Sequence, residues 1–142
     1  MTRLWQGGAE LQSVAASVEF GAIRTNAPVL ETSLQRSGVA AWRIANAAAA
    51  EGFTYAYTTA QGVYFYRFYL KFVALPTLTS VIGGFAQGAN NKITIRVTSG
   101  GALQLFNSED NAQIGSDSSA LSTSTGYRIE IGINTTTVSA TA

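Results

Sequence analysis

The sequence predicts an antiparallel β-sandwich or barrel, and three observations support this. Residues 63–72 form a long segment rich in aromatic side chains that contains no turn former. Short strand candidates recur at intervals of about 8–12 residues, with turn sequences between them. No segment shows a convincing helical repeat of apolar residues. The length of 142 residues suits one domain with its own core, so we expect a single domain over residues 1–142.

Side chains alternate between two faces along residues 63–72. One face is apolar and suits a core: Tyr64, Tyr66, Phe68, Leu70 and Phe72. The other face mixes rings with cations, which a dry interior would not tolerate: Val63, Phe65, Arg67, Tyr69 and Lys71. Because this segment is the longest strand candidate, we expect it to cross the middle of one sheet.

Short apolar segments predict the strands of the first sixty residues. They are residues 4–5, 9–11, 18–20, 29–34, 39–44 and 53–57. The rest of residues 22–36 is expected to be irregular. Five alanines in residues 45–50 have helical propensity, but the run is short and lacks a strong cap, so a tight corner is favoured. Gln61-Gly62 fits the turn of a hairpin between residues 53–57 and 63–72.

The second half of the chain has clearer alternation. Its predicted strands are residues 80–85, 92–98, 102–106, 113–115, 127–133 and 136–140. Ile93, Ile95 and Val97 are expected inward, as are the apolar residues of 127–133. Ser99-Gly100-Gly101 predicts a hairpin turn, and Gly83-Gly84 predicts a bulge or a close backbone approach. Residues 116–125 read as a polar loop.

Composition excludes several classes of site. The chain has no Cys and no His, which removes disulfides, the usual zinc sites, Ser-His-Asp and Cys-His catalysis and a histidine base. A formal net charge of +1 gives no electrostatic case for nucleic acid or an acidic membrane. No apolar segment is long enough for a membrane helix or typical of a signal peptide. We expect no cofactor.

The eight acidic residues include no close pair on one strand face, as a glycosidase would need. Glu130 shares its face with Arg128, which predicts an exposed ion pair. Asp110 and Asp117 are weak calcium candidates in turns rich in Asp and Asn. Their spacing matches no calcium loop, so hydrated turns and no metal are the favoured interpretation.

The most suggestive surface combines rings and cations. Its candidate residues for a ligand or partner are Phe65, Arg67, Tyr69, Lys71, Arg96 and Arg128, with Lys92 beside them. If their strands share a sheet, this face suits stacking on sugars or contact with a protein. The alternative is a solvated face whose rings a loop covers.

Strand and turn patterns over most of the chain resemble the concanavalin A-like or laminin-G-like jelly roll, in the form found in tailed-phage virion proteins. The resemblance rests on residues 4–11, 66–72, 93–105, 114–116 and 127–131. Two features depart from it. Gly126 stands where the family has a Trp, and the chain stops at Ala142 where the family continues with further strands. We therefore expect a fragment, or a sheet completed by a neighbouring subunit through strand addition.

The resemblance implies two functions, both without enzymatic activity. The first is a virion structural protein, a head decoration or tail-associated surface module, made in the host cytoplasm and carried on the virion surface. Its partners would be further copies of itself or other virion proteins. The second is a lectin-like module that binds carbohydrate.

Overall fold

The computed structural model describes residues 22–23, 28–34, 38–44, 53–54, 62–87, 90–134 and 139–141. These residues form eleven strands and no helix, and all pairings between the strands are antiparallel. The all-β prediction is therefore confirmed. The chain divides into two compact units, residues 1–60 and 61–142. A single domain over all 142 residues remains a prediction.

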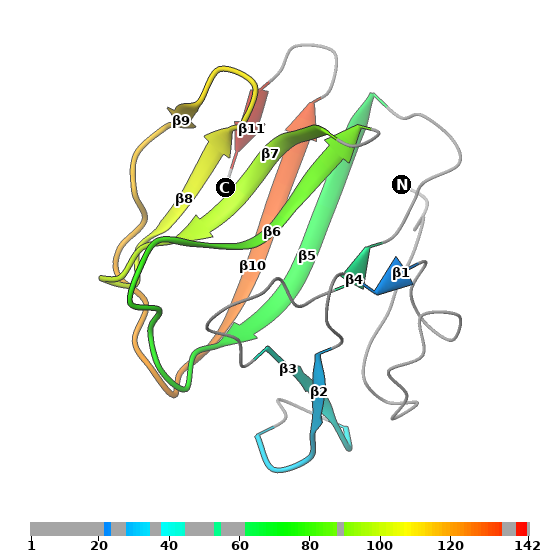
Figure 1. Ribbon diagram of the computed structural model, residues 1–142, viewed down its shortest axis with the longest axis vertical. Coiled ribbons are helices and arrows are strands. Elements are labelled where there is room, and N and C mark those ends of the chain that lie inside the picture. Colours follow the sequence, from blue (N-terminus) through cyan, green and yellow to red (C-terminus); the bar gives the residue numbers. More distant parts are fainter. Residues whose placement is uncertain are drawn as a thin grey trace. The chain divides into compact units, whose positions relative to one another are not determined.

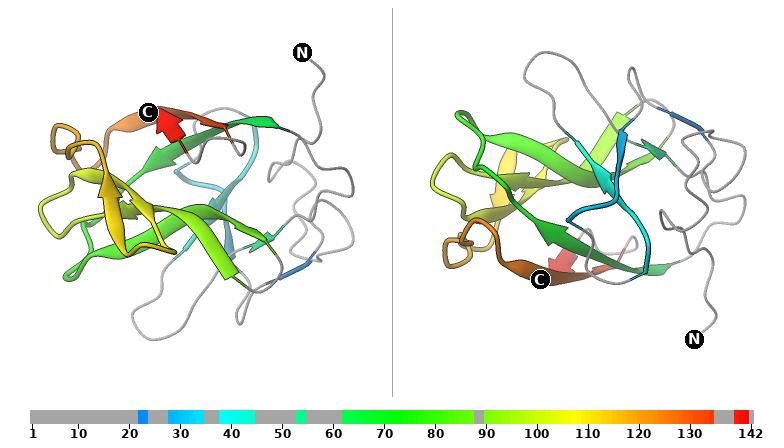
Figure 2. Two further views of the ribbon diagram at one scale, coloured as in Figure 1. Left: turned by 90° about the horizontal axis from the view of Figure 1, so that it is seen from above. Right: turned by 90° about the horizontal axis from the view of Figure 1, so that it is seen from below.

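Two antiparallel sheets in residues 61–142 form a sandwich (Figure 1). The three-stranded sheet has the order β11-β10-β5, with β5 (Val63–Lys71), β10 (Gly126–Asn134) and β11 (Ser139–Thr141). The four-stranded sheet is a meander of β6 (Ser80–Gln87), β7 (Asn90–Val97), β8 (Leu103–Asn107) and β9 (Ala112–Ile114). Figure 2 shows the two sheets as separate layers.

Apolar residues from both sheets meet between the layers. The buried cluster consists of Ile93, Ile95, Leu105, Ile131 and Ile133. The inward row of β5 packs against this cluster through Tyr66 and Phe68. Exposure alternates residue by residue along β5, as the two-residue period predicts. The predicted inward rows of β5, β7 and β10 are thus confirmed.

The glycine pair of β6 lies where the pairing with β7 becomes irregular. The register shifts between Val81 and Gly83. A Cβ atom at Gly84 would lie 2.6 Å from the carbonyl oxygen of Ile93, so the two backbones approach more closely there than any side chain allows. Both features predicted for Gly83-Gly84, the bulge and the close approach, are therefore present.

The polar loop of residues 116–125 is tied to the sandwich by backbone hydrogen bonds. The amide of Ser118 donates to Leu103 at 3.0 Å, that of Leu121 to Gly101 at 3.0 Å, and that of Ser124 to Phe72 at 2.7 Å. The Ser122 amide donates to the hydroxyl of Tyr127 at 2.8 Å. The loop is thus held at the end of the sandwich where β7 turns into β8.

The described segments of residues 1–60 contain two short strand pairs. β1 (Ala22–Ile23) pairs with β4 (Phe53–Thr54), and β2 (Val29–Glu31) pairs with β3 (Ala41–Arg43). The strands predicted within 29–34 and 39–44 are confirmed in shorter form. The expectation that residues 22–23 are irregular was wrong. The segments 4–5, 9–11, 18–20 and 45–50 lie outside the described residues.

The position predicted for residues 63–72 within its sheet was wrong, and the predicted hairpin is not tested. Phe53 and Thr54 pair with β1, but the rest of the hairpin predicted between residues 53–57 and 63–72 depends on residues 55–61, which lie outside the described residues. Among the described strands, β5 lies at one end of its sheet instead of the middle. Alternation along a strand reveals which side chains point inward, but it does not identify the neighbouring strand. The strand that pairs with β5 is β10, whose residues lie 55 or more positions further along the chain. Each residue of β5 pairs with one residue of β10.

Candidate functional site

The outward side chains of β5 and β10 form one continuous surface, which we call the β5–β10 face. It consists of Phe65, Arg67, Tyr69 and Lys71 from β5 and Arg128 and Glu130 from β10. Phe65 is 65% exposed and Tyr69 is 47% exposed. Because the two exposed rings lie on the same face of one strand, they form an apolar patch of the kind that marks interaction sites, so this face is the main candidate for binding.

Glu130 lies between two guanidinium groups on this face. It is directly opposite Arg67 in the register of the two strands and forms a salt bridge with its Nε. Nη2 of Arg128 lies 3.6 Å from the other carboxylate oxygen. The ion pair predicted between Arg128 and Glu130 is therefore confirmed, and Arg67 joins it. All three side chains are well exposed, so this network orients the guanidinium groups more than it stabilises the fold.

Tyr69 lies among three cations. Arg128 is its partner across the strands. Arg67 and Lys71 lie two residues away on either side along β5, on the same face. Side chains in such positions are neighbours on a sheet, about 5 Å apart across strands and about 7 Å apart along a strand. The face therefore presents an exposed ring surrounded by positive charge, with one carboxylate nearby.

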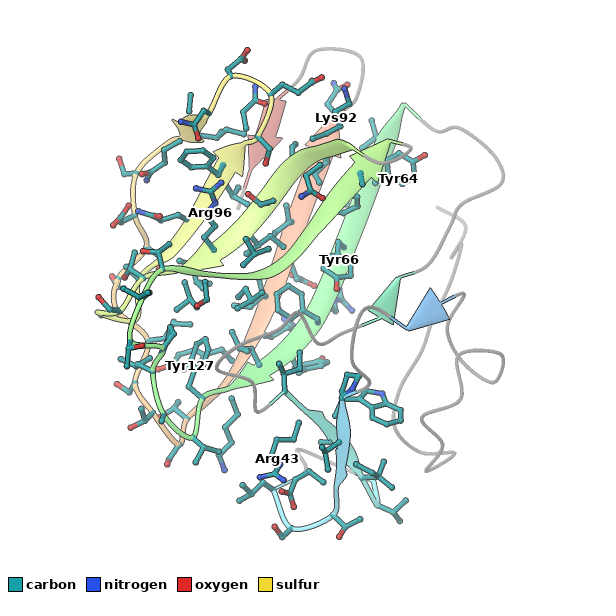
Figure 3. The ribbon with its side chains drawn as sticks, in the orientation of Figure 1. Arg43, Tyr64, Tyr66, Lys92, Arg96 and Tyr127 are labelled. Carbon is teal, nitrogen blue, oxygen red and sulfur yellow. The ribbon has the colours of Figure 1, made fainter. Side chains whose placement is uncertain are left out.

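Arg96 and Lys92 do not belong to this face. They lie on β7, in the four-stranded sheet (Figure 3). The guanidinium carbon of Arg96 lies 3.5 Å from the centre of the Phe106 ring, and its Nε donates to the hydroxyl of Thr94 at 3.2 Å. Lys92 forms a salt bridge with Glu109. The structure thus separates Arg96 and Lys92 from the other candidates and gives both of them partners within their own sheet.

The two weak calcium candidates accept hydrogen bonds from side-chain amides. Asp110 accepts from Nδ2 of Asn107 at 2.6 Å. Asp117 accepts from Nε2 of Gln104 at 3.0 Å and from Nε2 of Gln113 at 2.7 Å. In the described part of the chain, no group of three or more His, Cys, Asp or Glu side chains is placed to hold a metal ion. Asp110 thus bonds within the turn between β8 and β9, whereas Asp117 connects the loop of residues 116–125 to β8 and β9.

The amide donors around Asp117 give a testable pH effect. Hydrogen bonds from Gln104 and then Gln113 stabilise the ionised carboxylate and hold the pKa of Asp117 below its usual value. Because the pKa of Asp117 is lower in the folded state than in the unfolded state, its ionised carboxylate adds stability at pH values above the unfolded-state pKa. This stability is lost as the pH falls through the pKa of Asp117 in the folded state. We expect Gln104→Ala to raise the pKa of Asp117, as measured by carboxyl-detected NMR titration. An unchanged titration would show that Gln104 is not the main cause.

Two residues were not predicted as site residues, Glu130 on the β5–β10 face and Phe106 beside Arg96. Glu130 was recognised only as the partner of Arg128, because the register that brings Arg67 opposite it depends on pairing between distant strands. Phe106 was not singled out, although it lies beside Thr94 in the register and stacks under Arg96. The sequence did contain a signal for Phe106. Side chains alternate between two faces along residues 102–106, so Phe106 shares the outward face with Gln104, and Leu105 lies on the other face.

No family model, curated protein or solved structure matches the chain. Among the residues that the structure describes, no helix has the length and hydropathy needed to cross a membrane.

Proposed function

We propose that this chain is a non-enzymatic structural protein of a virion, a head decoration or tail-associated surface module, which contacts its partner through the β5–β10 face. The strand and turn patterns that resemble tailed-phage jelly rolls support the virion role. The observation that supports the contact surface is the exposure of two large rings, Phe65 and Tyr69, on either side of Arg67 along one strand face.

The composition of this face matches that of protein contact surfaces. Tyr, Phe and Arg are enriched at the centres of interfaces, and Tyr and Arg are frequent among the residues that dominate binding energy. Covering the exposed rings of Phe65 and Tyr69 removes apolar area from water, while the guanidinium groups held by Glu130 offer donors at fixed positions. A further copy of the chain or another virion protein would supply the covering surface.

A lectin-like role is the second candidate, and a different feature favours it. Tyr69 is flanked by groups that form hydrogen bonds, Arg67 and Arg128, with Glu130 close to both. A ring surrounded by such groups suits a sugar, whose C–H face stacks on the ring and whose hydroxyls meet the polar groups.

The virion role can be tested with virus particles purified from the source of the gene. We expect mass spectrometry to find the chain in these particles. We also expect the purified 142-residue chain to cosediment with particles from which it has been removed. Tyr69→Ala should weaken cosedimentation by about tenfold or more, since it removes a central ring. Val81→Ala, which shortens an exposed apolar side chain on the other sheet, is the matched control and should bind normally.

Three outcomes would count against parts of this proposal. Absence of the chain from the particles would contradict the virion role. Cosedimentation that Tyr69→Ala leaves unchanged would contradict the use of the β5–β10 face. Selective binding on a glycan array that Tyr69→Ala and Arg67→Ala abolish, by a chain absent from particles, would establish the lectin-like role instead.

A further inference from the structure

The β5–β10 face carries more positive charge than its own carboxylate can balance. Arg67 and Arg128 both form salt bridges with Glu130. Among the described residues, no carboxylate forms a salt bridge with Lys71, which lies on the same face. Three cations against one carboxylate leave two positive charges in excess. This excess lies beside the exposed ring of Tyr69.

The other cations of the described segments are balanced or covered within their own surroundings. Nε of Arg43 lies 3.7 Å from a carboxylate oxygen of Glu31, and Lys92 forms a salt bridge with Glu109. The guanidinium carbon of Arg96 lies 3.5 Å from the centre of a ring on the neighbouring strand. In the part of the chain that the structure describes, excess positive charge beside exposed rings is therefore a property of the β5–β10 face.

The size of this excess distinguishes between kinds of anionic partner. Outward residues of β5 are about 7 Å apart, so the row from Phe65 to Lys71 extends for about 20 Å. A nucleic acid strand carries one phosphate every ~3.4 Å, or about six over this length, and two excess cations do not balance them. A protein surface separates its carboxylates by uncharged residues, so about two carboxylates over the same length is an ordinary density. The charge therefore matches an acidic protein surface.

The spacing of the row matches a strand of such a partner. Along β5, rings and cations alternate in the order Phe65, Arg67, Tyr69 and Lys71. Side chains on one face of a partner strand also recur every second residue, about 7 Å apart. A partner strand that alternates apolar and acidic residues on one face can thus place an apolar group on each ring and a carboxylate beside each cation.

Charge also decides between the two kinds of partner that the proposed function allows. If a second copy presented the same face, both surfaces would carry two positive charges in excess, and this repulsion would oppose the contact. A different protein with an acidic surface has the complementary charge. The arrangement therefore favours another protein over a second copy that uses its own β5–β10 face.

We propose that the β5–β10 face binds a protein segment that alternates acidic and apolar side chains. Its carboxylates would lie beside Lys71 and the guanidinium groups of Arg67 and Arg128, and its apolar side chains would cover Phe65 and Tyr69. This inference rests on the proposed function in one respect, namely that this face contacts a protein partner. It goes further by naming the chemistry of that partner.

Immobilised peptides of about twelve residues test this chemistry without virus particles. The first peptide repeats the sequence leucine, threonine, glutamate, threonine, which alternates leucine and glutamate on one face of a strand. Two matched peptides replace every glutamate with glutamine or every leucine with threonine. We expect the purified chain to bind the first peptide about tenfold or more tightly than either matched peptide, because charge and apolar contact both contribute. Salt should weaken this binding, since exposed charges are screened.

Substitution of the cations locates the binding on the molecule. Lys71→Gln and Arg128→Gln should each weaken binding of the acidic peptide by about threefold or more. Lys92→Gln is the matched control, because it removes the same charge from an exposed salt bridge on the other sheet. Its binding should stay within about twofold of the unsubstituted chain. Circular dichroism of each variant separates loss of binding from loss of fold.

Glu130→Gln gives the test a sign. Glutamine keeps an oxygen that can accept a hydrogen bond from Arg67, but it removes the negative charge that faces an acidic partner. We expect binding of the acidic peptide to strengthen by about twofold or more. A ligand whose hydroxyl groups donate to the carboxylate would instead bind this variant more weakly. Glu109→Gln, which removes the same charge from the salt bridge on the other sheet, is the control and should change nothing.

Several outcomes would overturn the inference. It is wrong if the glutamine peptide binds as tightly as the glutamate peptide, if Glu130→Gln weakens binding, or if Lys92→Gln has the effect of Arg128→Gln. It is also wrong if single-stranded oligothymidylate binds more tightly than the acidic peptide. A dimer of the chain alone that Tyr69→Ala dissociates, as measured by analytical ultracentrifugation, would assign the face to a second copy instead.

Failure of this inference and failure of the proposed function give different results. A chain whose cosedimentation with particles requires Tyr69 but whose peptide binding ignores charge keeps the proposed contact face and loses the acidic partner. A chain that binds the acidic peptide through Lys71 and Arg128 but is absent from particles keeps the acidic partner and loses the virion role.

Discussion

Gly101→Ala is expected to lower the free energy of unfolding by about 2–4 kcal/mol, because strain in the backbone and crowding at the new methyl group add together. Gly101 has a φ of +88°, which side chains other than glycine rarely adopt. A Cβ atom there would lie 2.8 Å from the carbonyl oxygen of Leu121 and 3.2 Å from Cδ1 of Leu75. The crowded oxygen belongs to the loop residue whose amide donates to Gly101. Urea unfolding followed by circular dichroism measures this loss.

The neighbouring glycine is a control in the same turn. At Gly100 an added Cβ would meet no atom closer than the Thr98 hydroxyl oxygen, at 3.8 Å, and no positive φ is present. Gly100→Ala is expected to change stability by less than about 1 kcal/mol, and a small gain is reasonable because alanine restricts the unfolded chain. Equal losses for the two substitutions would show that the turn is sensitive to any side chain and that the geometry at Gly101 is not the cause.

The inward and outward rows of the sandwich could be predicted from the sequence, because a strand has a period of two residues. The alternation of apolar and polar residues in β7 identified Ile93, Ile95 and Val97 as core residues, and all three are buried. The same reasoning worked for β5 and β10. Local turn chemistry was equally informative, since Ser99-Gly100-Gly101 does connect β7 to β8.

Strand neighbours could not be predicted in this way, because pairing between distant segments depends on the register of whole rows. The pairing of the long strand with β10 could not be read from its own alternation. This limit affected the candidate site directly. Arg67 and Glu130 face each other only in this register, and Arg96 lies on the other sheet. The composition of the β5–β10 face was therefore predicted in part, while its organisation around Tyr69 required the structure.

Thr94 illustrates a second limit. Its place in the alternation of β7 predicts an outward, solvated side chain, and it does lie opposite the core row, but it is buried. Arg96 donates to its hydroxyl and lies over Phe106, which is the partner of Thr94 on β8. Long amphipathic side chains can cover their neighbours on the outer face of a sheet, and a two-residue period contains no information about this.

Ile95→Ala is expected to have an effect as large as that of Gly101→Ala, lowering the free energy of unfolding by about 3–4 kcal/mol. Ile95 is 1% exposed and belongs to the cluster that joins the two sheets. Its Cδ1 atom lies 3.2 Å from the position of a Cβ atom built at Gly83, so the side chain fills the space that this glycine leaves beneath the bulge. Truncation leaves a cavity between the two sheets, and the close packing of the surrounding cluster limits how far the structure can relax to fill it.

Val81→Ala on β6 is the matched control for this prediction. Val81 is 59% exposed and lies across from Arg96 in the β6–β7 register, so its truncation removes little buried area. Its effect on the free energy of unfolding should be within about 0.5 kcal/mol. If Ile95→Ala were as mild as Val81→Ala, the two sheets would not be held together by the cluster around Ile95. The rigid support for the β5–β10 face, which depends on Tyr66 and Phe68 packing against that cluster, would then have to come from elsewhere.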